Sequence, residues 1–184
     1  MCYYITAVLA AGTSLAIAQS VAERHARNLK PLENLSIQSQ LNRGEQYFLT
    51  TAGHCDCDTS LGLLTRKRPP HQSPGDKKAK KLAAAGWSSA KIERALSQSA
   101  RSQERSSDRA KQLANADSEA WIAFIEGMRT AGAPYIGILL HFYNGALSED
   151  IQLKERIVVR SAARAREILP RITEDTLYEF RLEA

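Results

Sequence analysis

This chain of 184 residues carries none of the common sequence signatures of catalysis. It has no serine nucleophile motif, no glycine loop that would cradle phosphate, no helix with paired metal-binding histidines and no carboxylate pair at catalytic spacing. No segment repeats along the chain. The sequence therefore does not predict an enzyme of a familiar motif class, and its length predicts one ordinary domain with an appendage.

Cysteine is scarce and long apolar runs are absent. Three cysteines, an odd number, argue against a disulfide framework. The apolar residues of "MCYYITAVLAAGTSLAIAQS" follow no basic segment and are interrupted by Thr, Ser and Gly, which argues against a signal peptide or a membrane span. We therefore expect a cytoplasmic protein without membrane contact, in which the cysteines are free thiols or metal ligands.

The first sixty residues predict a strand, a helix and a second strand. Residues 2–9 are rich in β-branched and aromatic side chains, as a buried strand is. From Ser14 an apolar stripe with helical spacing continues to the region before Pro31. Residues 45–51 then predict a short second strand, so the chain is expected to begin with a βαβ-type unit.

The last third predicts a helix and further strands. Asp117 is expected to cap an apolar helix, and residues 135–143 are almost continuously apolar, as a central strand would be. Asn144-Gly145 predicts a hairpin that leads into a returning strand over 151–160, and the tail over 177–182 predicts an edge strand or, as the alternative, a last helical turn. Together these patterns predict an α+β core domain, residues 1–65 and 117–184, with a single mixed sheet and packed helices.

Positive charge is concentrated in the segment that interrupts this core, residues 66–116. Residues 66–111 hold thirteen Lys or Arg and four Asp or Glu, a net charge of +9, whereas the other residues carry twelve basic and sixteen acidic side chains, a net charge of −4. Residues 66–76 are expected to be an exposed linker, followed by two helices that break at Gly86. Such a basic arm predicts an acidic protein surface or a nucleic-acid backbone as its partner.

The segment "LAAAGWSSAKIERAL" resembles the first two helices of a helix-turn-helix module, although the expected third helix is missing. The resemblance implies contacts to phosphate that position without specifying sequence. The alternative is a solvated helical hairpin. The residues expected to bind the partner are Lys77, Lys78, Lys80, Lys81, Trp87, Lys91 and Arg94.

The most distinctive local pattern is "GHCDCD", residues 53–58. Cys55 and Cys57 could share a zinc ion if the chain curls, which Gly53 would permit, with Cys2 as a third ligand. The fourth ligand would be a histidine, for which the candidates are His25, His54 and His141. Two alternatives remain: a tight turn capped by Asp56 or Asp58, and a pair of redox-active thiols.

Cys2 also suggests an enzyme hypothesis. Removal of Met1 would expose a thiol beside an α-amine, a nucleophile with its own base. The Met-Cys start resembles that of class II glutamine amidotransferases and abasic-site crosslinking proteins, although those families continue with glycine where this chain has Tyr3. The sequence thus predicts a binding or regulatory protein with a basic arm and a cysteine site for zinc or redox chemistry, and as the alternative an enzyme that uses Cys2 or a metal held by Cys55 and Cys57.

Overall fold

The structure of the chain is a computed structural model. It describes all residues except 58, 60, 63–73 and 183–184, and it leaves undescribed the side chains of 74–78, 103, 104, 106–111, 113 and 114. The chain divides into two compact units, one made of Met1–Arg66 and Ala114–Ala184 and the other of Lys67–Leu113.

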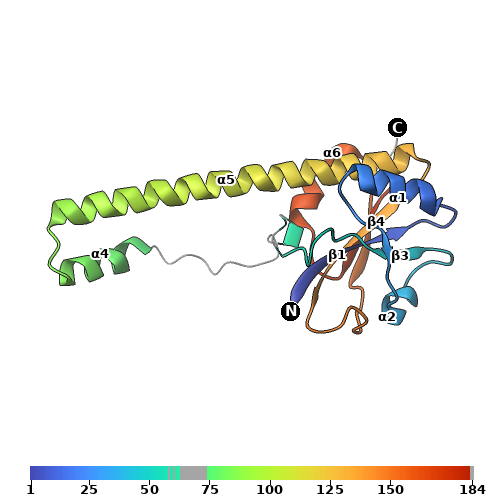
Figure 1. Ribbon diagram of the computed structural model, residues 1–184, viewed down its shortest axis with the longest axis horizontal. Helices are drawn as coiled ribbons and strands as arrows, with labels where there is room; N and C mark the ends of the chain where they lie inside the picture. Colours follow the sequence, from blue (N-terminus) through green and yellow to red (C-terminus); the bar gives the residue numbers. More distant parts are fainter. Residues whose placement is uncertain (58, 60, 63–73, 183–184) are drawn as a thin grey trace. The chain divides into compact units, whose positions relative to one another are not determined.

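A single mixed sheet of six strands forms the first unit, with the order β2-β3-β1-β4-β6-β5. All neighbouring strands are antiparallel except β5 and β6, which are parallel. The expected α+β class is therefore confirmed (Figure 1). The strands are β1 (Cys2–Leu9), β2 (Lys30–Pro31), β3 (Gln46–Leu49), β4 (Ile136–Tyr143), β5 (Glu155–Val159) and β6 (Thr176–Phe180).

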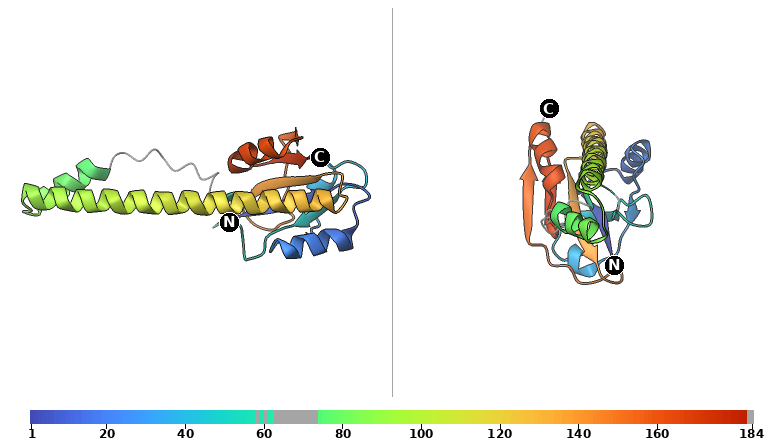
Figure 2. Two further views of the ribbon diagram at one scale, coloured as in Figure 1. Left: turned by 90° about the horizontal axis from the view of Figure 1, so that it is seen from above. Right: turned by 90° about the vertical axis from the view of Figure 1, so that its left-hand side faces the viewer.

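Helices from three parts of the chain cover one face of this sheet, and one short helix lies against the other face. The helical segments are α1 (Leu15–Arg24), α2 (Leu35–Gln38), α4 (Pro74–Ala84), α5 (Ser89–Thr130), α6 (Ala162–Ile168) and the 3₁₀ turn η1 (Leu169–Arg171). Seen from above in Figure 2, α6, the C-terminal part of α5 and α1 lie side by side over the strands. Their apolar side chains, such as Val21 and Trp121, form one core with Ile5 and Ile138 of the sheet.

The opposite face of the sheet buries a smaller apolar cluster. Because side chains alternate along a strand, Val8, Leu139 and Leu177 point away from the large core and pack with Ile37 of α2 and Ile151 of the β4 to β5 connection. The central strands are thus covered on both sides, which explains the nearly continuous apolar run of β4.

Three strand expectations are wrong. β1 and β3 pair antiparallel, so the chain does not begin with a parallel βαβ unit. Asn144-Gly145 does not form a tight hairpin: both backbone N–H groups donate to the Glu149 carboxylate, at 3.1 Å in each case, and β5 pairs with β6 instead of β4. β6 therefore lies inside the sheet, between β4 and β5, and is not its edge.

The helix expected to begin at Asp117 begins far earlier. α5 runs through 42 residues, so Asp117 lies within it and pairs with Arg27, whose Nη2 is 3.1 Å from Oδ1. The break expected at Gly86 is present between α4 and α5, whereas most of the expected linker, residues 66–73, lies outside the described residues. Within the described part of the chain, no helix combines the length and apolar character needed to cross a bilayer.

Candidate metal centre

The three cysteines converge at the start of β1. Cys2 begins this strand, and Cys55 and Cys57 lie in the loop that follows β3. Their Sγ atoms all lie within 4.8 Å of one another, and they form the one group of three potential metal ligands among the described residues. Thiolates that share a tetrahedral zinc ion are separated by roughly 4 Å, because each Zn–S bond is about 2.3 Å long. The three sulfurs could therefore hold a metal ion after a shift of about an ångström.

Backbone pairing places the cysteine loop against β1. β3 pairs only with the second half of β1, so the loop after β3 continues along the first half. The Thr50 N–H donates to the Ile5 carbonyl at 3.2 Å, and the Asp56 N–H donates to the Tyr3 carbonyl at 2.8 Å. Side chains accept the strand's own donors: the Ile5 N–H bonds Asp56 Oδ2 at 2.8 Å, and the Tyr3 N–H bonds Cys57 Sγ at 3.2 Å. The loop thus acts as a substitute strand.

Asp56 is an anchor of this loop. Its Oδ2 also accepts the Thr51 hydroxyl at 2.5 Å, and its side chain is buried. Burial raises the pKa of Asp56, although the hydrogen bonds from Thr51 and Ile5 and the charge of Arg27 act in the opposite direction. The carboxylate is committed to β1, which matches the turn-holding role that the sequence left open for it.

Gly62 lets the loop close on itself. A Cβ built on Gly62 would lie 2.0 Å from the Asp56 carbonyl oxygen and 3.4 Å from the Cys57 Cα. Gly53, the glycine that the sequence suggested for the curl, has no positive φ, and a Cβ there would meet no atom within 4 Å. The close approach that requires glycine is therefore at Gly62, which the sequence pattern did not single out.

The thiols crowd one another. The backbone N–H of Cys57 acts to lower the pKa of Cys55, but burial and the neighbouring thiols Cys57 and Cys2 outweigh it and raise the pKa to about 11. Without a nearby cation, the Cys55 thiol is thus protonated at neutral pH. A metal ion would supply the missing positive charge and displace the proton.

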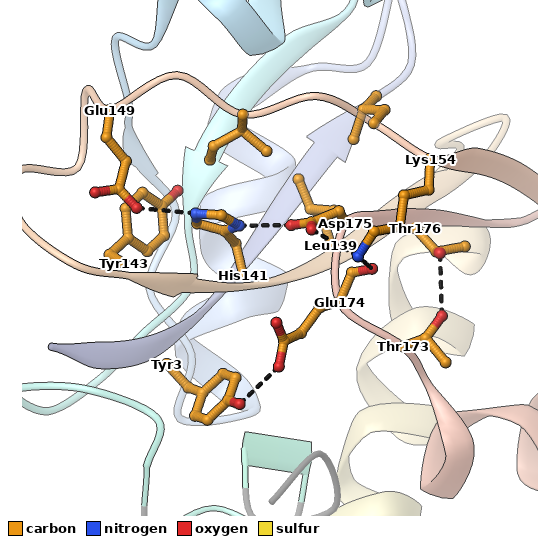
Figure 3. A network of polar contacts seen from close by, with 12 residues as sticks. Tyr3, Leu139, His141, Tyr143, Glu149, Lys154, Thr173, Glu174, Asp175 and Thr176 are labelled. Atoms are coloured by element: carbon orange, nitrogen blue, oxygen red, sulfur yellow. Dashed lines mark hydrogen bonds and ion pairs between the residues drawn. The ribbon is translucent and has the colours of Figure 1, made fainter.

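None of the candidate histidines joins the cysteine group. His54 is exposed, and His25 lies edge-on to Phe124, with ring centroids 6.2 Å apart. His141 belongs to a separate polar network (Figure 3). Its Nδ1 lies 2.5 Å from Asp175 Oδ1, and its Nε2 lies 3.0 Å from Glu149 Oε1.

This polar network reaches the cysteine loop through Tyr3. Lys154 Nζ lies 2.8 Å from Asp175 Oδ2, and the Tyr3 hydroxyl donates to Glu174 Oε1 at 2.6 Å (Figure 3). Tyr3 therefore bonds Cys57 with its backbone and Glu174 with its side chain. Of this network the sequence pattern singled out only His141, as a candidate metal ligand, because the members are separated along the chain and meet only in the folded sheet.

Arg27 is a second residue that the sequence did not indicate. Its guanidinium carbon lies 3.6 Å from the ring centroid of Trp121, and it pairs with Asp117. Burial lowers the pKa of Arg27, and the charges of Asp117 and Asp56 oppose the shift. In the sequence, Arg27 stands out only as a charged residue directly after the apolar stripe of the first helix, which does not indicate its contacts with Trp121 and Asp117.

The expected partner-binding residues lie in the second compact unit. Lys80, Lys81, Lys91 and Arg94 are exposed, and Lys91 Nζ lies 4.2 Å from the ring centroid of Trp87. The side chains of Lys77 and Lys78 lie outside the described part of the chain.

We predict that Gly62→Ala opens the cysteine loop, whereas Gly53→Ala leaves it intact. The added methyl group at Gly62 would overlap the Asp56 carbonyl, so we expect the free energy of unfolding to fall by about 1–3 kcal/mol. Gly53→Ala should change stability by less than about 0.5 kcal/mol. Urea denaturation of both variants checks this, and equal stability of the two would contradict the geometry.

We predict that the His141 network loses its stabilising effect in acid. Hydrogen bonding to His141 lowers the pKa of Glu149. Burial would raise the pKa of Asp175, but its hydrogen bonds to Lys154 and His141 outweigh burial, so the pKa of Asp175 is lowered as well. Both folded pKa values lie below the unfolded values of about 4, so this stability is present above pH 4 and is lost as pH falls through the folded pKa values.

Asp175→Asn removes one of these carboxylates. At pH 7 we expect the variant to lose on the order of 1–2 kcal/mol of unfolding free energy. Its stability should also fall less steeply than that of the unmodified protein between about pH 5 and pH 2. The exposed Asp150, changed to Asn, is the matched control, and denaturation over a pH series is the measurement. Parallel pH curves for Asp175→Asn and the unmodified protein would refute the prediction.

Comparison with known proteins adds no family to these observations. No protein family, curated protein or solved structure matches the chain. The geometry of the three cysteines is therefore the basis on which a function can be argued.

Proposed function

We propose that this protein binds a thiophilic metal ion, zinc in the first instance, through the thiolates of Cys2, Cys55 and Cys57. The observation that carries the proposal is the approach of the three sulfur atoms to within 4.8 Å. Cysteine thiolates are soft ligands that select zinc and other thiophilic ions over magnesium or calcium. Cys2 and Cys57 are 55 residues apart in sequence, so an ion held between them would also fasten the loop to β1.

Backbone donors support the thiolate form of this site. The Tyr3 N–H donates to Cys57 Sγ at 3.2 Å, and the Cys57 N–H acts on Cys55. Hydrogen bonds from outside the ligand set commonly orient metal ligands and stabilise their charge. Such donors stabilise thiolates once a metal ion has displaced the protons.

The site would leave one coordination position open. Among the described residues, no histidine or carboxylate stands close enough to complete a group of four with the cysteines. Cys2 and Cys55 are half-buried, so the open position would lie toward their accessible side. Structural zinc sites are closed by four protein ligands, whereas sites with three protein ligands keep a position for water or substrate. The proposed centre therefore belongs to the class that exchanges a ligand.

We predict near-stoichiometric zinc in protein purified under reducing conditions without a histidine tag. Replacing any one of Cys2, Cys55 and Cys57 by Ser should lower the metal content at least tenfold, because each removes a third of the ligand set. His54→Ala, which changes an exposed side chain in the same loop, is the matched control and should retain the metal. Elemental analysis gives the readout.

Two outcomes would overturn the proposal. Protein that is folded, fully reduced and metal-free, and that takes up neither zinc nor cadmium, would make the cluster a structural turn. A disulfide between two of the cysteines in freshly prepared protein, found by mass spectrometry, would favour the redox alternative.

We also predict that zinc stabilises the fold. A ligand that binds only the folded state adds about 2.7 kcal/mol when its free concentration is one hundred times its Kd. The midpoint of thermal unfolding should therefore rise with added zinc in the unmodified protein and stay constant in the Cys55→Ser, Cys57→Ser double variant. An equal rise in both proteins would place the binding elsewhere.

A further inference from the structure

The helical hairpin of the second unit is fixed by its turn. Gly86 has a φ of +78°, and its N–H donates to the Ala83 carbonyl at 3.0 Å, while the Trp87 N–H donates to the Leu82 carbonyl at 3.1 Å. This pair of bonds is the Schellman motif, which ends a helix and commonly brings the residues at Leu82 and Trp87 into apolar contact. The turn thus sets α4 beside the first turns of α5.

An apolar groove of about 460 Å³ lies between these two helices. Ala79 and Ala83 line it from α4, and Ile92 and Leu96 line it from α5. Each pair is spaced by four residues, so its members stand one above the other on the same helix face. Small residues on one wall and branched residues on the other leave room for side chains of a third helix.

The segment that forms the groove has a net positive charge. Residues 79–102 contain five Lys or Arg and one acidic residue, Glu93. The lining itself contains Lys80 and Glu93, and the exposed Lys81, Lys91 and Arg94 belong to the same two helices outside the lining. A second copy of the chain would bring the same positive charge to the groove, which disfavours self-association. Charge complementarity requires an acidic occupant.

The apolar lining distinguishes between the two acidic classes. A nucleic-acid backbone is held by cations, and a groove lined by Ile92 and Leu96 offers it little. An amphipathic helix uses both features, since its apolar side chains enter the groove and its charges meet the rim. Trp87 is the aromatic side chain on which a base could stack, and Lys91 already occupies one face of its exposed ring.

We propose that the groove between α4 and α5 docks an amphipathic helix of an acidic partner protein, whose apolar side chains pack against Ile92 and Leu96 and one of whose carboxylates meets Lys80. This interaction is separate from the metal centre and does not depend on it.

Fluorescence anisotropy with the full chain tests the proposal. The probe is a labelled 18-residue peptide in which leucines recur every three or four positions and the other positions are Glu and Ala. A second peptide has the same composition, with the leucines distributed around the helix. We expect the amphipathic peptide to bind at least about tenfold more tightly, because one leucine fully buried contributes about that factor or more.

Variants of the protein locate the binding. Ile92→Ala with Leu96→Ala should weaken the amphipathic peptide at least about tenfold while preserving helix content by circular dichroism, since alanine is the strongest helix former. Lys80→Gln should weaken binding and reduce its salt dependence. Arg101→Gln removes the same charge outside the groove lining and is the matched control, for which we expect less than a twofold change.

Four outcomes would overturn the proposal. These are failure of the amphipathic peptide to bind, equal affinity of the two peptides, displacement of the peptide by an 18-nucleotide oligo-dT that binds more tightly, and dimerisation of the protein that the Ile92→Ala, Leu96→Ala variant abolishes. The third would assign the surface to nucleic acid and the fourth to a second copy of the chain.

Discussion

On the side of β1 that faces β3, no strand supplies hydrogen-bond partners to the backbone of the first half of β1. The cysteine site depends on how the chain supplies these partners. β1 lies inside the sheet, but β3 ends before it reaches Ile5 and Tyr3. A buried backbone group without a partner costs about 1–3 kcal/mol. The loop after β3 provides the partners through two backbone bonds, the Asp56 carboxylate and the Cys57 sulfur. Once these contacts form, Cys55 and Cys57 must lie beside Cys2.

Tyr3 connects this loop to the polar network around His141. Its N–H bonds Cys57, its ring lies 4.8 Å from that of Phe142, and its hydroxyl bonds Glu174. Glu174 directly precedes Asp175, which bonds both His141 and Lys154. A displacement of Tyr3 would therefore disturb both clusters, so the cysteine loop and the turn before β6 are expected to respond together when either is altered.

Local patterns allowed much of the fold to be predicted, whereas strand pairing was beyond them. β1 coincides with the expected strand, and β4 is the expected central strand. The hairpin at Asn144-Gly145 failed because Glu149 takes both turn N–H groups, and because β6 occupies the edge of β4 that β5 would have needed. Asp117 was expected to be a helix cap because the local sequence does not distinguish an aspartate that caps a helix from one inside it. Its ion-pair partner in the structure, Arg27, is 90 residues away in sequence.

The sequence indicated the ligands of the cysteine site but not the residue that lets the loop close. The spacing of Cys55 and Cys57 suggested ligands, and the start of β1 suggested Cys2, but the curl was attributed to Gly53 when the close approach is at Gly62. The close approach of Gly62 to Asp56 follows no sequence motif, so it becomes visible only in the folded loop.

The structural role of the loop and the metal-binding role that we propose for it are compatible, and only Cys57 takes part in both. Pairing of β1 explains why an acceptor stands at Asp56 and at Cys57, since each accepts a strand N–H. It does not explain cysteines at positions 2 and 55, whose sulfurs accept neither of these strand donors but approach Cys57 from two segments of the chain. Burial and the crowding of three thiols raise the pKa of Cys55, so the arrangement opposes ionisation unless a cation is present. A positive ion between the sulfurs would reverse this effect, and it is the simplest role that accounts for all three cysteines at once.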